Sequence, residues 1–224
     1  VVDGDDWVDK DGLAELVERL KKCEADYVFT NYYEVNDMTG EKTPVTFSGI
    51  EADREFPFER IADKKGISMH ALVIKTSLLK ENGIRLDEHC FYVDVEYILY
   101  PIPYVERVVY YDIYVYMYRL AQVNQSVSML GYQKHMQNHI DVILHILEYI
   151  NGYRLKDDCD EQKERYMERR VADMINNQVD IFISFPAGDG YIKKKFAQFD
   201  EAVKKRNYRV YQRAGELSHV LRLL

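Results

Sequence analysis

The chain has 224 residues, 47% of them hydrophobic, which suffices for one large domain or for a medium domain with an appendage. Its 38 acidic residues outnumber the 30 basic ones and give a formal net charge of −8. No dense block of Lys and Arg interrupts this acidic composition, so we expect no nucleic acid partner.

The three cysteines, Cys23, Cys90 and Cys159, are far apart and form no Cys-x-x-Cys pair. This spacing indicates neither a disulfide framework nor a cysteine zinc site, and it suits a reducing cytoplasm. No apolar run approaches the roughly 20 residues that span a bilayer. We therefore expect a cytoplasmic protein without a transmembrane segment, and peripheral association with the inner face of the membrane stays open.

The predicted elements begin with Val1-Val2 as the end of a buried strand, followed by an acidic turn at residues 3–6. Apolar residues then recur at helical spacing from Leu13 to Leu20, which predicts a helix. Aromatic and β-branched residues fill 26–36, a turn follows, and 43–47 returns, which is typical of a β-hairpin.

Further along, residues 68–75 predict a strand, 76–82 a short helix ended by Gly83, and 94–100 a helix ended by Pro101. Residues 107–111 and 114–118 predict a pair of Tyr-rich strands.

After Ser128 the hydrophobic pattern changes to long helical periodicity, over residues 129–150, 161–183 and 191–205 with a tail to 224. We therefore predict a mixed α/β portion over 1–128 and a helical appendage over 129–224.

Segments of the first portion resemble one enzyme family, in the family's order. One is VVDGDDWV, similar to the strand end and acidic Asp-x-Asp turn of the inverting family 2 glycosyltransferases. Another is FYVDVEYILYPIPYVERVVYYDIYVYMYR with NQSVS, which resembles the family's catalytic acid at a helix start, Tyr-rich strands, Tyr-x-Tyr-Arg and polar turn. Between them GISMHALVIKTSLLKENGIRLDEH resembles the acceptor side.

The resemblance implies an α/β fold: the C-terminal part of a GT-A-like nucleotide-diphospho-sugar transferase, starting at the Asp-x-Asp motif, followed by helices. It implies that the nucleotide-binding half lies upstream and that this chain alone lacks it. The implied donor is a nucleotide sugar, by analogy a UDP-sugar, and the implied acceptor is a glycan or a lipid-linked glycan of bacterial surface polysaccharide. The expected activity is hexosyl transfer with inversion.

Transfer from a nucleotide diphosphate requires stabilisation of the departing diphosphate, and Mn²⁺ or Mg²⁺ held by carboxylates supplies it. The resemblance assigns donor binding to Asp3, Asp5 and Asp6, with Asp5 as the direct metal ligand. On an extended segment Asp3 and Asp5 would point the same way. The alternative is an acidic turn that only caps the following helix.

Transfer with inversion also requires a general base on the acceptor hydroxyl. The family's base position falls on Asp94, at a predicted helix start. Family members often carry Glu-Asp here, whereas this chain has Val93 before Asp94. The alternative is that Asp94 is a plain helix cap.

Two further residues are candidates for contacts to acceptor or phosphate, and both have an ordinary structural alternative. His70 lies on a predicted strand, and the alternative to a functional contact is that it is a buried core histidine. Arg119 ends the Tyr-rich strands, and the alternative to a phosphate contact is that it is an exposed strand-end arginine without a function. For the chain as a whole, the alternative to an enzyme is a non-catalytic, truncated transferase scaffold that binds a protein or a glycan.

A calcium loop is a weaker interpretation of the first residues. Asp9, Asp11, Gly12 and Glu18 match positions three, five, six and twelve of an EF-hand, but Trp7 at position one offers no oxygen ligand.

Overall fold

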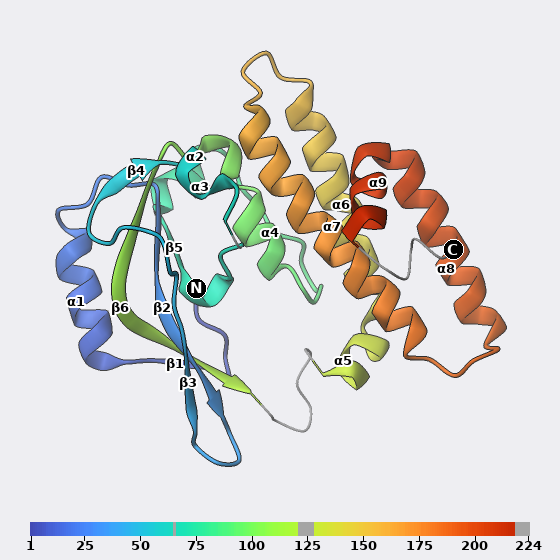
Figure 1. The fold of residues 1–224 in the computed structure, drawn as a ribbon, viewed down its shortest axis with the longest axis horizontal. Helices are drawn as coiled ribbons and strands as arrows, with labels where there is room; N and C mark the ends of the chain where they lie inside the picture. The colour runs from blue at the N-terminus through green and yellow to red at the C-terminus, as the bar shows by residue number, and fades with distance from the viewer. Residues whose placement is uncertain (65, 121–127, 218–224) are drawn as a thin grey trace. The chain divides into compact units, whose positions relative to one another are not determined.

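The computed structural model describes residues 1–64, 66–120 and 128–217, drawn in colour in Figure 1. The chain forms two compact units. The first, here the sheet unit, comprises Val1–Arg85 and Tyr104–Gln125. The second, the helical unit, comprises Leu86–Pro103 and Ser126–Leu224. The predicted division near residue 128 did not anticipate that 86–103 belongs with the helices.

The sheet unit is built on two long strands, β2 (Tyr27–Asn36) and β6 (Arg107–Leu120), which pair in parallel. Their register runs from Tyr27 opposite Val108 to Asn36 opposite Leu120, with a bulge near Asn31. Short antiparallel strands complete both edges. On β6 they are β1 (Trp7–Val8) and β4 (Glu55–Pro57), and on β2 they are β3 (Lys42–Val45) and β5 (Leu72–Ile74).

Helix α1 (Lys10–Leu20) covers one face of this sheet, as Figure 1 shows beside β6. It begins at Asp9, whose carboxylate accepts a hydrogen bond from the Gly12 amide at 2.8 Å. Leu16 faces inward against a buried apolar cluster on the strands, which comprises Val28, Val109, Tyr111, Ile113 and Val115. Burial of these side chains is the main force that holds α1 on the sheet.

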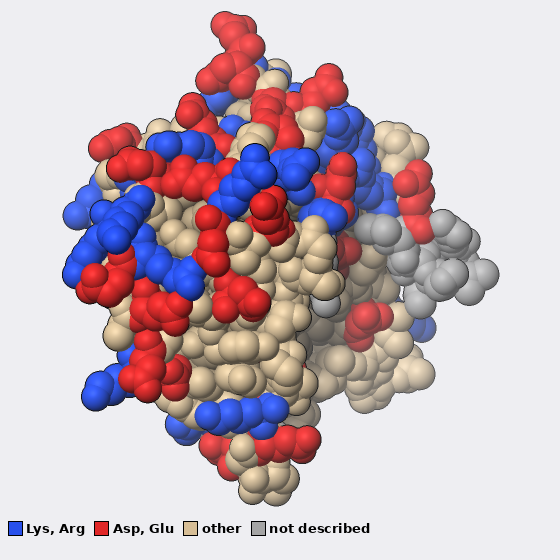
Figure 2. All heavy atoms as spheres, turned by 60° about the vertical axis from the view of Figure 1, so that its left-hand side comes forward, with Lys and Arg blue, Asp and Glu red and all other residues tan. Residues whose placement is uncertain are grey.

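Short helices fill the connections of the sheet unit: α2 (Glu59–Ala62), α3 (Thr76–Glu81) and the 3₁₀ turn η1 (Met69–Ala71). On the face that Figure 2 brings forward, Lys and Arg alternate with Asp and Glu and do not gather into a patch of one sign.

The helical unit consists of one short helix from the 86–103 segment and the helices after residue 128. The first is α4 (Asp94–Leu99), and the turn η2 (Ile102–Tyr104) after it ends at the first residue that returns to the sheet unit. The others are α5 (Met129–Lys134), α6 (Met136–Arg154), α7 (Glu161–Ile183), α8 (Gly190–Arg206) and α9 (Tyr208–Leu217). Aspartate caps set the starts of two long helices. Asp160 accepts hydrogen bonds from the Gln162 and Lys163 amides before α7, and Asp189 accepts from the Tyr191 and Ile192 amides before α8.

A buried network of charges joins three of these helices. Glu164 and Glu168 of α7 are 4% and 1% exposed. Arg154 of α6 bonds to both carboxylates, and Arg209 of α9 lies 3.1 Å from Glu168 and 3.7 Å from Glu164. Carboxylates so deeply buried are tolerated only when they are paired, so this network fixes how α6, α7 and α9 pack.

The predicted fold class is confirmed as an α/β sheet unit with a helical C-terminal region. The hairpin is confirmed as β2 and β3, and the helix predicted at 161–183 is α7. No helix in the described ranges is both long and apolar enough to cross a membrane.

Four local predictions were wrong. Val1 and Val2 are 67% and 50% exposed and lie outside any strand, because the edge strand begins only at Trp7. The two Tyr-rich strands are one, β6. The strand predicted at 68–75 starts only at Leu72, after η1, and the first long helix divides into α5 and α6 at His135.

A substitution at Gly12 tests how closely α1 packs on β6. A Cβ atom added there would lie 2.0 Å from the carbonyl oxygen of Tyr114, so α1 would have to move away. We predict that Gly12→Ala costs roughly 1–3 kcal/mol of stability, the usual range for overpacking. Urea denaturation followed by the fluorescence of Trp7, the single tryptophan, measures this in the sheet unit.

The matched control is Gly152 in α6, where nothing lies within 4 Å of an added Cβ atom. Gly152→Ala should be neutral or stabilise its helix by about 0.5–1 kcal/mol. Equal urea midpoints for Gly12→Ala and the unsubstituted protein would contradict the close approach.

Candidate metal site and the other predicted residues

The acidic segment before β1 is a tight turn. The Asp6 amide donates to the Asp3 carbonyl at 3.2 Å, which closes residues 3–6 into a turn. This geometry brings Asp3 and Asp6 to the same side. The predicted acidic turn at residues 3–6 is confirmed, whereas the extended geometry on which Asp3 and Asp5 would alternate is not found.

Tyr116 of β6 holds this turn in place. Its hydroxyl donates to Asp6 Oδ2 at 2.7 Å and accepts from the Asp3 amide at 3.1 Å. The other oxygen of Asp6 accepts from the backbone amide of Arg119 at 2.7 Å. The turn is therefore fixed to the C-terminal part of β6, next to the pairing of β1 with Met117.

His70 lies on η1, over the side chains at the same end of the sheet. Its ring stacks on Tyr118 with centroids 3.7 Å apart and meets Tyr116 edge-on at 5.1 Å, while Tyr32 lies 5.5 Å away. Burial lowers the pKa of His70 to about 4. Its imidazole is consequently neutral at pH 7 and keeps a lone pair for a hydrogen bond or a metal ion.

Asp3, Asp6 and His70 converge. Each offers one ligand atom, and the three atoms lie within 4.8 Å of one another. Partial burial raises the pKa of Asp3, and the charges of Asp6 and Asp5 raise it further. The pKa of Asp6 is raised mainly by burial, against the lowering effect of its hydrogen bonds from Arg119 and Tyr116. Like charges held together in this way are relieved by a cation.

Two predicted residues have different surroundings. Asp5 is exposed and is not one of the three converging residues. Arg119 reaches the site through its backbone amide, whereas its guanidinium lies 3.6 Å from Asp37 and 5.1 Å from the centre of the Trp7 ring. The calcium-loop interpretation finds no support, because Asp9 caps α1 and Gly12 belongs to the helix.

Asp94 is the first residue of α4, in the helical unit. The cap position before it is Val93, which makes no side-chain cap hydrogen bond. The charge of Asp94 contributes to the raised pKa of Tyr92 and of Tyr132, in both cases after burial. The polar turn predicted at 124–128 falls, up to residue 127, outside the described residues.

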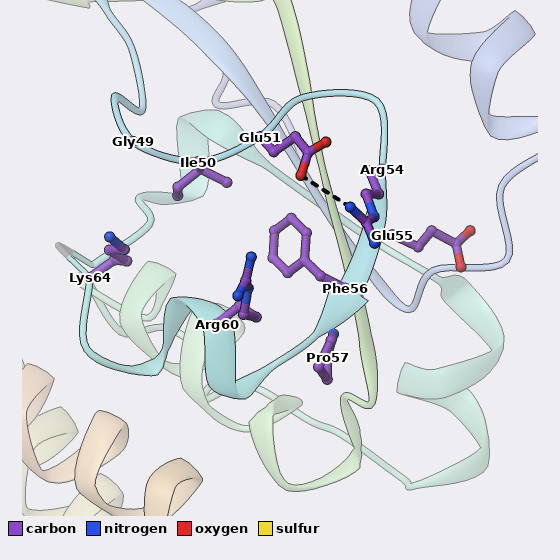
Figure 3. Close-up of a pocket in the computed structure, with 9 residues that line it drawn as sticks. All are labelled: Gly49, Ile50, Glu51, Arg54, Glu55, Phe56, Pro57, Arg60 and Lys64. Atoms are coloured by element: carbon purple, nitrogen blue, oxygen red, sulfur yellow. Dashed lines mark hydrogen bonds and ion pairs between the residues drawn. The ribbon is translucent and has the colours of Figure 1, made fainter.

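A surface pocket of about 610 Å³ lies elsewhere in the sheet unit, around Phe56 (Figure 3). Its rim carries Arg54, which pairs with Glu51 at 3.4 Å, as well as Arg60 and Lys64. The pocket adjoins β4, which pairs with the first residues of β6. The acidic turn is attached near the other end of β6, roughly 30 Å further along this strand. It contains none of the predicted site residues.

Sequence reasoning missed Tyr116 as the anchor of the acidic turn. Alternation along the strand places Tyr114, Tyr116 and Tyr118 on one face, and this pattern marked a polar aromatic surface. Nothing in the pattern indicated that the acidic turn would fold back onto it, because residues 6 and 116 are paired only by the tertiary fold.

The buried neutral state of His70 predicts a pH effect on stability. The folded pKa lies below the unfolded value of about 6.5, so the stabilisation is complete above that value and is lost as pH falls towards 4. The full effect is about 3 kcal/mol. Urea denaturation of metal-free protein between pH 7 and 4, followed by Trp7, should show this loss, and His70→Gln should lack it. Parallel pH profiles for the two proteins would refute the assignment.

No family model and no curated protein sequence matches the chain. Among solved structures, the chain is similar to the crystal structure of S. aureus TarS 1–349, with a TM-score of 0.51 and 14% sequence identity. The similarity covers 92% of this chain and 56% of that one, so this chain spans just over half of the TarS structure. The chain therefore has a glycosyltransferase-like fold, shared with TarS along nearly all of its length.

Proposed function

We propose that this chain is the metal-binding and acceptor-side part of a glycosyltransferase that uses a nucleotide-diphosphate sugar, with a UDP-sugar as the favoured donor. The observation that carries the proposal is the convergence of Asp3, Asp6 and His70 beside a strand end. The fold shared with TarS along 92% of this chain supports a transferase.

Asp3, Asp6 and His70 would hold a divalent cation, which when bound neutralises charge on the donor diphosphate. Two carboxylates and a neutral imidazole suit Mn²⁺ better than Mg²⁺, which prefers oxygen ligands and water. Tyr116 orients Asp6 through its hydroxyl and so fixes the ligand that it touches. In this proposal Asp5, which the sequence had favoured as the metal ligand, contacts the donor from the exposed side of the turn.

Asp94 is the proposed general base. As the first residue of α4 it lies near the positive end of the helix, which favours the ionised carboxylate. An ionised carboxylate can take the proton of an acceptor hydroxyl as that oxygen attacks the sugar, with inversion at the reacting carbon. The proposed acceptor is a glycan or a lipid-linked glycan in bacterial surface polysaccharide synthesis, reached at the inner face of the membrane.

The metal assignment is tested by calorimetric titration of UDP in the presence of Mn²⁺. We predict that Asp6→Asn and His70→Gln each raise the dissociation constant about tenfold or more, the effect of losing roughly 1.4 kcal/mol or more. Asp5→Asn should have a smaller effect. Asp11→Asn, an exposed acid in the first turn of α1, is the control and should bind as the unsubstituted protein does.

A larger loss in Asp5→Asn than in Asp6→Asn would return the metal to Asp5 and contradict the role given to His70. Absence of Mn²⁺-dependent UDP binding in every protein would favour the alternative, a non-catalytic scaffold that binds a protein or a glycan.

The base assignment is tested by UDP release from a panel of UDP-sugars with glycan acceptors. We predict that Asp94→Asn lowers turnover by about 10²–10⁴, the range for a general base, while Mn²⁺–UDP affinity stays unchanged. Glu88→Gln, an exposed acid in the same unit, is the control and should keep full turnover. Turnover by Asp94→Asn equal to that of the unsubstituted protein would show that another group takes the proton.

A further inference from the structure

A second group of metal-ligating side chains lies in the helical unit. It comprises Asp87 from the loop before α4, Glu96 from α4 and His145 from α6. One ligand atom from each lies within 4.8 Å of the others, and His145 Nδ1 is 2.6 Å from Asp87 Oδ2. The proposed transferase chemistry uses none of these three residues.

Glu96 is the unusual member of this group, because its side chain is 0% exposed. The Asp87 amide donates to its Oε2 at 2.9 Å, and the Tyr100 hydroxyl donates to its Oε1 at 3.1 Å. These two bonds hold the carboxylate in one orientation. Burial raises the pKa of Glu96, and the neighbouring charge of Asp87 raises it further.

The surroundings add negative charge without a permanent counter-charge. Within the described part of the chain, no Lys or Arg forms an ion pair with Asp87 or Glu96, and His145 is the one basic group that touches Asp87. The thiol of Cys90 has its pKa raised by burial and then by Asp87, Glu96 and Asp141. A buried carboxylate such as that of Glu96 normally has a cation, a metal ion or several donors beside it.

We propose that Asp87, Glu96 and His145 form a binding site for a divalent transition-metal ion of the zinc class. Mixed oxygen and imidazole ligands suit such an ion. Ligand atoms about 2.1 Å from a tetrahedral ion are about 3.4 Å apart, a separation that lies within the range found here, so small side-chain rotations suffice. Asp87 and His145 are 33% and 49% exposed, which leaves the remaining coordination position open to water.

The site would tie the segment before α4 to α6. This segment carries two non-glycine residues in the left-handed region, His89 at φ 55° and Tyr92 at φ 70°. Such conformations are strained and persist only where the surroundings hold them. Tyr92 is held by stacking on Tyr132 at 5.0 Å, and the metal ion would hold the other end at Asp87. The inference does not depend on the proposed transferase activity.

The test uses the chelator-treated protein, titrated with Zn²⁺ by calorimetry and with Co²⁺ by absorption. The sheet-unit cluster is removed in an Asp6→Asn/His70→Gln background, in which one equivalent of metal should still bind. Adding His145→Gln or Asp87→Asn to that background should abolish binding or raise the dissociation constant more than about tenfold. Zn²⁺ should also raise the melting temperature of the background protein, and this rise should disappear with His145→Gln.

Three control variants change side chains next to this site without removing one of its three ligands. Asp141→Asn removes nearby charge, Cys90→Ser removes the nearby thiol, and His89→Asn removes an exposed histidine of the same loop. All three should bind Zn²⁺ as the background protein does.

Two outcomes would overturn the proposal. One is unchanged stoichiometry and affinity with His145→Gln, even if that variant is less stable, because His145 and Asp87 would then form only an ion pair. The other is a thiolate-to-cobalt charge-transfer band that is lost with Cys90→Ser.

Discussion

The parallel pairing of β2 with β6 is the constraint on which the candidate metal site depends. The acidic turn is attached to β6 through β1 and through Tyr116, whereas His70 enters from β5 on the far edge of β2. These two attachments come close only because β2 and β6 are neighbours over their whole length and η1 lies across both. A slip of one residue in this register would turn Tyr116 and Tyr118 to the other face, and His70 would lose its contacts.

Helix α1 supports that pairing from the opposite face. Gly12 lets the first turn of the helix approach the backbone of Tyr114, and Leu16 inserts into the apolar cluster on the strands. The chain thus separates two tasks across one sheet. Apolar packing on the α1 face fixes the strands, and the polar aromatic residues on the other face position the acidic turn and His70.

In both units, pairs of carboxylates lie close together although their like charges repel each other. In the sheet unit Asp3 and Asp6 share a neutral histidine, and in the helical unit the buried Glu96 lies beside Asp87. The network of Glu164 and Glu168 is different, because Arg154 and Arg209 supply permanent positive charge. Arginine keeps its proton at every relevant pH, so that network is a structural one. The other two clusters contain a histidine, whose imidazole can bind a metal ion when it is neutral, and this difference makes them candidates for metal ions.

The sequence by itself determined the elements whose signal is local. Helical periodicity defined α7, aromatic and β-branched residues followed by a turn defined the β2–β3 hairpin, and the acidic segment marked where to look for a cation. The α/β class with a helical C-terminal region followed from the same patterns. These features depend on neighbours within a few residues, so the chain order contains the information.

The tertiary structure alone decided which side chains meet. The turn at residues 3–6 followed from the sequence, but only the fold brought Asp3 and Asp6, and not Asp5, together with His70. The fold also placed His70 on a 3₁₀ turn over Tyr118, joined residues 86–103 to the helices, and brought His145 to Asp87 across 58 residues of sequence. Contacts of this range are set by strand register and helix packing, which act on the whole core at once and leave no periodic trace in the residues that they bring together.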